Sequence, residues 1–409
     1  MSPTEGHIFH SRLTHTLEVA QIGRRLAERL IERNSWDLLE TMGGLDPDVV
    51  ESACLAHDLG HPPFGHVAEA ELQTILRDSH AQLLGGFEGN AQSFRIVTKL
   101  AIHTPPGPDL NANYLGLNLT RTTQNAMLKY PWERQESGKG SRKWSVYESE
   151  EPDFEWVRQG LFNLGTARTV EAEIMDWADD VAYAIHDVED FFRAGIIPLD
   201  ALCRTDSPLA PRFIDAVEGH RRNSPPDDTF SMAQLGQAFE AIMAFVRDVI
   251  GLTEPYNGSR DHRGRLRTMT SHLIGLYINA ASLRDHRDDQ RGWLEKEQTS
   301  HMQVIVLQAL TRHLVINRPS LETQQHGLRL VIRGLFETYS MAAGDRATWR
   351  IFPRLYQEEL ERIARQEPDK NSSTTRMVVD LVSSMSEHEA LSRYRMLTGQ
   401  APGSIMERI

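Results

Sequence analysis

The stretch EAEIMDWADDVAYAIHDVED, residues 171–190, decides the fold of this chain. Apolar residues recur three or four positions apart through it and its flanks: Val170, Ile174, Trp177, Val181, Ile185, Val188 and Phe192. That spacing places them on one face of an α-helix. We therefore expect a helix over residues 170–192 that buries this face in the interior of the protein.

Helical periodicity also governs most of the remaining sequence. In residues 13–33, His15, Val19, Ile22 and Leu26 share one helix face. In residues 47–58, Pro47 suits a first helical turn. Further helical patterns cover about 231–251, 268–284, 299–316, 322–340, 348–365 and 374–397. Strand-like alternation does not persist anywhere in the sequence, so we expect an all-α fold.

The breaks between these patterns are short and polar. They lie at residues 105–114, 133–145, 219–228, 253–265 and 365–375. The residue types that carry chemistry are concentrated in the first half of the chain. We expect a helical core in residues 1–200 and a helical C-terminal region in residues 201–409, the two packed as one globular unit.

Composition narrows the class of protein. The chain has 409 residues, of which 40% are hydrophobic and 25% charged, as in ordinary globular proteins. Its formal net charge of −13 repels nucleic acids and anionic membranes, which disfavours nucleic-acid binding as the main role without excluding it. Cys54 and Cys203 are too few for a disulfide framework or a thiolate zinc site. No apolar run reaches membrane-spanning length, and MSPTEGHIFHSR at the N-terminus lacks a signal region, so we expect a cytoplasmic protein.

The segment CLAHDLGHPPFGHVAEAEL, residues 54–72, carries three histidines and an aspartate around a Gly-Pro-Pro break. His57 and, far upstream, His15 both extend apolar helix faces and are expected to point inward. Asp58 follows His57 directly, and a buried carboxylate is costly unless it is paired or bound to a cation. Imidazoles together with carboxylates suit a first-row transition metal. A single histidine on an apolar helix face, such as His15, is more often a hydrogen-bonded core residue than a ligand.

A second set of polar residues lies on the helix expected over residues 170–192. Asp176, Asp179, Tyr183 and Asp187 form a stripe away from its apolar face. Such a stripe is compatible with a solvated acidic surface. It is also compatible with a cleft wall, on which one carboxylate binds a metal ion and a tyrosine ring packs against a sugar.

Long motifs of this chain resemble those of the HD-domain phosphohydrolases, and in particular the bacterial deoxyguanosine triphosphate triphosphohydrolase (dGTPase) family. The similar stretches include RLTHTLEVAQIGRRLA, HDLGHPPFGHVAE, GGFEGNAQSFRIV, LNLTRTTQNAMLKYPW and AEIMDWADDVAYAIHDVED. The resemblance implies an HD-type helical metal core in which His15, His57, Asp58 and Asp179 ligate one divalent ion. It leaves the ion open among Mn, Mg, Fe, Ni, Co and Zn, and it leaves open whether additional Mg accompanies the nucleotide.

The resemblance also implies an activity and an assembly state. The expected reaction is hydrolysis of dGTP, and possibly of other deoxynucleoside triphosphates, to a deoxynucleoside and inorganic triphosphate. The protein is expected to form a homo-oligomer. The alternatives are another HD phosphohydrolase, acting as a nucleotidase or phosphodiesterase, and a non-catalytic, nucleotide-regulated oligomer.

The remaining candidate residues take roles around this reaction. His66 is the candidate proton-transfer residue, and Glu69, three positions on, is its orienting partner on a shared helix face. The candidate substrate-binding residues are Arg12, His61, Asn90, Lys129, Tyr183 and Asp187. Arg12 and Lys129 are expected to contact phosphate, and Tyr183 and Asp187 the deoxyribose. Many relatives carry a histidine where Gly89 stands here, so no catalytic role is expected at that position.

Overall fold

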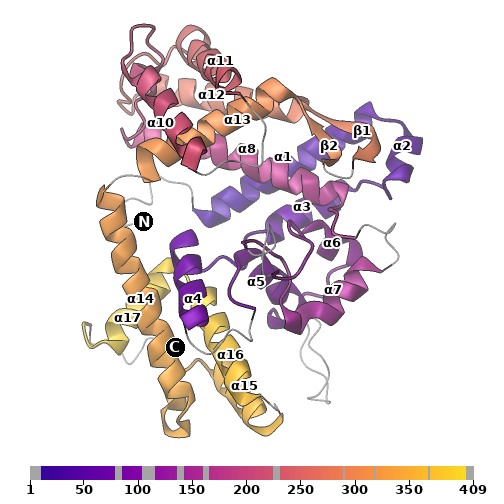
Figure 1. Ribbon diagram of the computed structural model, residues 1–409, viewed down its shortest axis with the longest axis vertical. Coiled ribbons are helices and arrows are strands. Elements are labelled where there is room, and N and C mark those ends of the chain that lie inside the picture. Colours follow the sequence, from indigo (N-terminus) through magenta and orange to yellow (C-terminus); the bar gives the residue numbers. More distant parts are fainter. Residues whose placement is uncertain are drawn as a thin grey trace. The chain divides into compact units, whose positions relative to one another are not determined.

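In the computed structural model the described chain is mostly helical, with one small two-stranded sheet, which confirms the all-α expectation (Figure 1). The structure describes residues 11–78, 85–103, 116–135, 142–159, 165–223, 231–288, 291–316, 319–366 and 369–401. The expected break at residues 105–114 and the N-terminal residues 1–10 lie outside these ranges. None of the described helices is long and apolar enough to cross a membrane.

The described chain forms two compact units, each discontinuous in sequence. Unit 1 comprises Met1–Leu55, Asn125–Met127 and Ala167–Glu322, and unit 2 comprises Ala56–Gln124, Leu128–Thr166 and Thr323–Ile409. These units are defined by packing alone. The expected division near residue 200 into a core and a C-terminal region therefore stays a prediction.

Unit 1 is built on three helices that meet at one glycine. These helices are α1 (Arg12–Arg33), α3 (Pro47–Ala56) and α8 (Val170–Arg193). A Cβ atom added at Gly23 of α1 would lie 2.6 Å from Cys54 Sγ, 3.1 Å from Val50 Cγ1 and 3.6 Å from the Cβ of Ala178. The missing side chain therefore lets α1 approach both α3 and α8 closely. The apolar face predicted for residues 170–192 is buried as expected.

The other helices of unit 1 surround this group. They are α2 (Trp36–Thr41), α9 (Leu199–Leu202), α10 (Leu209–Asn223), α11 (Met232–Ala244), α12 (Arg260–Asn279) and α13 (Gln298–Thr311). Single π-helical stretches, η5 (Phe245–Ile250) and η6 (Arg312–Ile316), extend α11 and α13. Both cysteines, Cys54 and Cys203, are buried in this unit.

One element of unit 1 contradicts the sequence prediction. The helix expected over 268–284 ends at Asn279, and a hairpin of β1 (Ala281–Asp288) and β2 (Gly292–Lys296) follows. The two strands are antiparallel, with Leu283 opposite Leu294. The carboxylate of Glu173 accepts hydrogen bonds from the backbone N–H groups of Trp293 and Leu294, at 2.9 and 2.7 Å. Glu173 thus satisfies two backbone donors of the hairpin from more than a hundred residues away. A local sequence pattern cannot predict such a contact.

Unit 2 contains a second hydrophobic core. It is formed by α4 (His66–Asp78), α14 (Pro319–Ala343), α15 (Arg354–Gln366), α16 (Lys370–Ser384) and α17 (Glu387–Leu397). Shorter elements complete the unit: α5 (Gly89–Arg95), η2 (Ile96–Leu100), α6 (Arg121–Ala126), η4 (Glu148–Glu150), α7 (Glu151–Arg158) and η7 (Arg346–Ile351). α6 continues across the boundary, since Asn125–Met127 belong to unit 1.

Two long helical patterns of unit 2 are interrupted. The expected helix over 348–365 breaks at Phe352 and Pro353, because a proline disfavours helical geometry at the residue before it and Phe352 is extended (φ −84°, ψ 148°). The expected helix over 374–397 is two helices, since Ser386 caps a new one by accepting from the backbone N–H of Glu389.

The close approach at Gly23 predicts a specific stability effect. Replacing Gly23 by Ala forces the Cβ against Cys54, so we expect the free energy of unfolding to fall by about 1–3 kcal/mol, as for an overpacked core. The measurement is urea unfolding followed by circular dichroism. The matched control is Gly236→Ala in α11, where an added Cβ meets nothing within 4 Å and stability should hold or rise. Equal stability of the Gly23→Ala and wild-type chains would contradict the proposed packing.

Candidate active site

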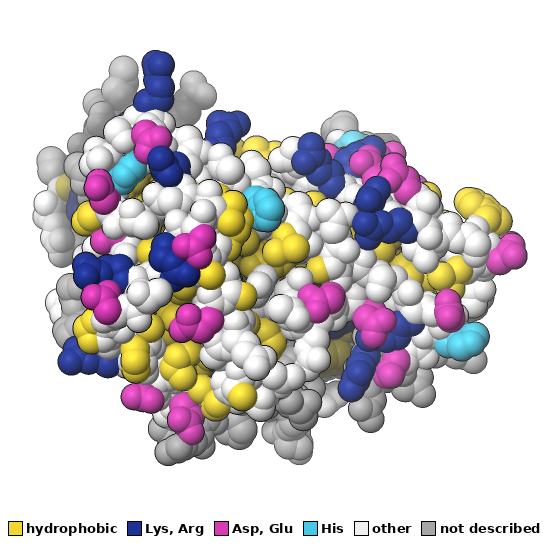
Figure 2. Space-filling model, turned by 90° about the horizontal axis from the view of Figure 1, so that it is seen from above, with side chains coloured by type: hydrophobic (Ala, Val, Ile, Leu, Met, Phe, Trp, Pro, Cys, Tyr) yellow, Lys and Arg dark blue, Asp and Glu magenta, His cyan; other side chains and the backbone are white. Residues whose placement is uncertain are grey.

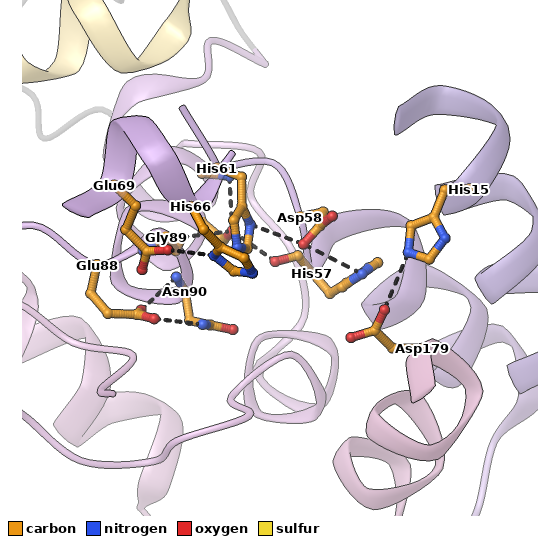
Figure 3. Close-up of polar contacts among 12 residues, drawn as sticks. His15, His57, Asp58, His61, His66, Glu69, Glu88, Gly89, Asn90 and Asp179 are labelled. Carbon is orange, nitrogen blue, oxygen red and sulfur yellow. Dashed lines mark hydrogen bonds and ion pairs between the residues drawn. The ribbon is translucent and has the colours of Figure 1, made fainter. Parts of the chain in front are cut away.

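His15 and Asp179, two of the ligands that the family resemblance implies, come together within unit 1. His15 lies in the first turn of α1, whose N-cap Ser11 accepts from the backbone N–H of Thr14. Its Nε2 atom is 3.2 Å from Oδ1 of Asp179 on α8 (Figure 3). Both side chains are about one-fifth exposed, at 19% and 22%. Residues 164 positions apart are thus paired at a partly covered surface.

The apolar face of α3 points toward the same region. Burial raises the pKa of the Cys54 thiol, and the negative charge of Asp179 raises it further. Cys54 therefore lies within electrostatic reach of the aspartate. His57 follows Cys54 by three residues, just past the C-terminal end of α3, and continues the Val50–Cys54 face by one turn. Residue 56 is the first of unit 2.

His57, Asp58 and His61 form a compact group in unit 2. His57 is buried, and its Nε2 lies 3.5 Å from Oδ1 of Asp58. The same Asp58 oxygen is 2.9 Å from Nδ1 of His61. Burial acts to lower the pKa of His61, but the Asp58 carboxylate outweighs it, so the net pKa is raised. These three side chains therefore lie within contact of one another, and their role in a site stays a prediction.

The loop after α3 is fixed by α5. Ser93 Oγ donates to the carbonyl of His57 at 2.8 Å and accepts from the N–H of Gly60 at 2.9 Å. A Cβ at Gly60 would collide with the backbone of Ser93 and Gly89, so only glycine fits. Phe64 has a positive φ of 69°, an unfavourable geometry for a side-chain-bearing residue, and its ring packs on the unit 2 core. This packing holds the turn that starts α4 at His66.

His66 and Glu69 pair as predicted from their spacing. Nδ1 of His66 is 2.9 Å from Oε2 of Glu69, while the His66 side chain is 81% exposed (Figure 3). Burial alone would raise the pKa of Glu69, but the hydrogen bond to His66 and the charge of Lys143 lower it well below its usual range. Glu69 is thus held ionised, and His66 presents its remaining ring nitrogen toward solvent.

Sequence reasoning missed Lys143 and Glu88. Lys143 Nζ is 2.9 Å from Oε1 of Glu69 and 3.0 Å from Oε1 of Glu88. Burial and the Glu69 charge raise the pKa of Glu88, although Lys143 opposes them. Asn90 donates from Nδ2 to Glu88, as Figure 3 shows, and Glu88 also caps α5. The only local signal for Lys143 was a basic loop, GKGSRK, which by itself indicates nothing beyond a solvated turn.

α16 supports this network from the C-terminal part of the chain. Asp380 accepts from Gln92 at 2.8 Å and forms an ion pair with Arg95 at 2.8 Å. The Arg376 guanidinium lies 3.9 Å from the ring centre of Tyr147 and donates to the Gly86 carbonyl. The C-terminal region therefore anchors the segment that carries Glu88 and Asn90.

Gly89 lies directly beneath a histidine ring. An added Cβ at this position would lie 3.0 Å from Nε2 of His61, closer than ordinary contact. His61 therefore fills the space next to residue 89, which gives a physical reason for glycine there. His61, His66 and Glu69 also offer ligand atoms within 4.8 Å of one another, so this group is a second candidate for holding a cation.

The substrate-binding candidates are distributed over both units. On α8, the Tyr183 hydroxyl donates to Asp187, and the pKa of Tyr183 is raised by burial first and then by that carboxylate. Asp176, from the same stripe, pairs instead with Arg168 at 2.7 Å. Arg12 is exposed at the start of α1. Lys129 is half-buried just after α6 in unit 2, where the ring of Tyr130 packs edge-on against Trp132.

Comparison with known proteins defines the class. Residues 12–104 match the HD domain, and residues 294–396 match the phosphohydrolase-associated domain. The helical fold, with its paired histidine and aspartate residues, agrees with an HD-domain phosphohydrolase.

The relatives define the family within that class. The chain is 35% identical to a deoxyguanosinetriphosphate triphosphohydrolase-like protein of Streptomyces coelicolor, over 95% of this chain and 84% of that protein. It is 32% identical to the protein of that name from Corynebacterium efficiens, over 98% and 86% of the two chains. The counterpart in Bifidobacterium longum is 40% identical over 65% of this chain and 50% of its own. The chain belongs to the HD-domain, dGTP triphosphohydrolase-like family.

Lys143 yields a prediction on stability. Replacing it by Met leaves Glu69 and Glu88 facing each other without their cation, so the free energy of unfolding at pH 7 should fall by about 1–3 kcal/mol. The lowered pKa of Glu69 contributes stability above its unfolded pKa of about 4.3, and this contribution is lost as pH falls. The deficit should therefore be full at pH 7, begin to shrink below about pH 4.3, and be clearly smaller at about pH 3.

Urea unfolding at both pH values measures this difference. Lys370→Met, at the exposed start of α16, removes the same charge and serves as the control that should behave like wild type. A deficit in Lys143→Met that is equal at both pH values would contradict the proposed charge network.

Proposed function

We propose that this protein is a metal-dependent hydrolase that cleaves dGTP, and possibly other deoxynucleoside triphosphates, to a deoxynucleoside and inorganic triphosphate. The observation that carries the proposal is the contact between His15 and Asp179, which pairs two predicted ligands from distant parts of the sequence. Membership in the HD-domain, dGTP triphosphohydrolase-like family supports the substrate class.

The proposed ligands of one divalent ion are His15 and Asp179 together with His57 and Asp58. Two imidazoles and two carboxylates fit Mn, Fe, Co, Ni or Zn, and the carboxylates also tolerate Mg. Each histidine lies close to one of the aspartates. Nε2 of His15 is 3.2 Å from Oδ1 of Asp179, and Nε2 of His57 is 3.5 Å from Oδ1 of Asp58. When bound, the ion would withdraw negative charge from an α-phosphate oxygen.

The chain's own residues would handle the proton. Hydrolysis joins a water oxygen to the α-phosphorus, breaks the bond to the 5′ oxygen of the deoxyribose, and requires a proton on that leaving oxygen. Ionised Glu69 accepts from Nδ1 of His66, so the exposed Nε2 is the ring position that exchanges a proton. Glu69 and, through it, Lys143 are proposed to position this imidazole.

The remaining candidates are proposed to hold the nucleotide. Arg12 and Lys129 supply cationic groups for the triphosphate, with His61 in support beside Asp58. Asn90, fixed by Glu88, is proposed to line the site. Tyr183 is 41% exposed and hydrogen-bonded to Asp187. A ribose 2′-hydroxyl would clash with its ring, so Tyr183 and Asp187 are proposed to select deoxyribose.

Partners beyond the nucleotide remain predictions from the sequence. Assembly into a homo-oligomer and a cytoplasmic location follow from the family resemblance and the composition. Basic and acidic side chains are interspersed over the face drawn in Figure 2, and the net charge of −13 disfavours nucleic-acid binding as the main role.

Product analysis tests the proposed activity. Purified protein is incubated with each deoxynucleoside triphosphate and with GTP, in the presence of Mn, Mg, Co or Ni. We expect deoxyguanosine and inorganic triphosphate from dGTP, little turnover of GTP, and loss of activity after chelation that added metal restores. Release of orthophosphate or pyrophosphate would indicate a different HD phosphohydrolase, and no turnover of any nucleotide would indicate a non-catalytic protein.

Two substitutions separate metal binding from proton transfer. Asp58→Ala should lose both bound metal and hydrolysis, because a ligand is removed. His66→Ala should retain the metal but turn over about 10²–10⁴-fold more slowly, the usual contribution of a proton-transfer group. Metal content by mass spectrometry and kcat are measured on the same preparations. Loss of metal from His66→Ala, with Asp58→Ala still loaded, would reverse the assignment.

A further inference from the structure

A second side-chain contact joins the two helices that carry His15 and Asp179, and the proposed function does not use it. Nε2 of His186 on α8 lies 3.0 Å from Oε2 of Glu18 on α1. The side chain of His186 is 7% exposed and that of Glu18 is 30% exposed, and both contacting atoms are buried. Because a buried carboxylate oxygen is costly without a partner, this contact belongs to the packing of α1 against α8.

The contact lies beside the proposed metal ligands on both helices. Glu18 follows His15 by three residues on α1, and His186 follows Asp179 by seven residues on α8. Residues at these spacings lie on the same side of a helix. Each helix therefore presents one proposed ligand and one member of this second pair to the other helix.

The angle between α1 and α8 controls where the first turn of α1 lies. A Cβ added to Gly23 would lie 3.6 Å from the Cβ of Ala178, so the two helices cross at this point. His15 is eight residues away, about 12 Å along α1, so a rotation of about ten degrees about the crossing would move His15 by about 2 Å. Metal sites require ligand distances to within about 0.2 Å. The crossing angle must therefore be fixed by more than the contact at Gly23.

The contact between His15 and Asp179 cannot fix this angle alone. The atoms that it joins, 3.2 Å apart, are the proposed ligand atoms, so they cannot hold each other while they bind an ion. The pair of Glu18 and His186 contains no proposed ligand. On α1, Glu18 also lies between His15 and the crossing at Gly23, where a contact restrains rotation of the helix.

We propose that Glu18 and His186 are positioning residues, whose contact sets the crossing angle of α1 and α8. By doing so they set the separation of His15 and Asp179. They act through the helices and not through contact with the substrate. The inference deepens the proposed function and rests on it, because it takes His15 and Asp179 as ligands of one ion.

Titration with Co²⁺ measures the effect without relying on catalysis. Binding to the purified, chelator-treated protein is followed by the visible absorption of the ion. Glu18→Ala and His186→Leu should each weaken binding at least about tenfold, the lower end of the loss seen when residues that support metal ligands are replaced. The double variant should bind no more weakly than the weaker single variant, because both substitutions remove the same contact.

Conservative variants separate positioning from a general loss of packing. Glu18→Gln keeps an oxygen that accepts, and His186→Gln keeps an N–H that donates. Each should therefore bind Co²⁺ more tightly than Glu18→Ala or His186→Leu, with visible bands close to those of wild type.

Glu189→Ala is the matched control. Glu189 accepts from Thr270 Oγ1 at 2.6 Å, which ties α8 to α12 and not to α1. Urea unfolding reports the stability of every variant, and Glu189→Ala should lose stability while it binds Co²⁺ as wild type does. Glu18 is partly exposed, so Glu18→Ala decides the question alone if His186→Leu does not fold.

Wild-type affinity for Co²⁺ in Glu18→Ala would overturn the inference. An equal loss of affinity in Glu189→Ala would also overturn it, because general destabilisation would then explain the effect. Absence of Co²⁺ binding by the wild-type protein would instead overturn the proposed metal site, and this inference with it.

Discussion

The close approach of α1 to α3 and α8 at Gly23 is the constraint on which the rest of unit 1 depends. With no side chain at this point, Val50, Cys54 and Ala178 pack within contact distance of one helix. The same packing brings the first turn of α1 to α8, where His15 meets Asp179 at 3.2 Å. A larger residue at the crossing would disturb both the core and the pairing of two proposed ligands. In this unit, the close packing of the core therefore also sets the positions of His15 and Asp179.

In unit 2, several ionisable side chains lie close together, and the surrounding structure holds them in place. Ser93 and Gly60 fix the loop that follows α3, and the packed ring of Phe64 stabilises an unfavourable backbone geometry just before His66. Lys143 then balances the carboxylates of Glu69 and Glu88. Glu69 stays ionised beside an exposed imidazole, which is the arrangement that the proton transfer proposed for His66 requires.

Features that depend on local sequence patterns could be predicted from the sequence, whereas features that depend on long-range contacts could not. The periodicity over 170–192 and the three-residue spacing of His66 and Glu69 are properties of single helices, and the structure contains both. The hairpin at 281–296 depends on Glu173, more than a hundred residues away, and the helical pattern over 268–284 wrongly predicts helix for its first four residues. Lys143 was missed for the same reason, since its partners lie 74 and 55 positions earlier. Pairing of His15 with Asp179 was expected only through family resemblance.

We propose that one divalent ion is held by the imidazoles of His15 and His57 and the carboxylates of Asp58 and Asp179. X-ray absorption spectroscopy of the cobalt- or manganese-loaded protein tests it most directly when wild type is compared with His15→Ala and His61→Ala. The account predicts two histidine nitrogens and carboxylate oxygens around the ion, one nitrogen fewer in His15→Ala, and an unchanged spectrum in His61→Ala. A spectrum that changes only in His61→Ala would place the ion with His61, His66 and Glu69 and would contradict the account.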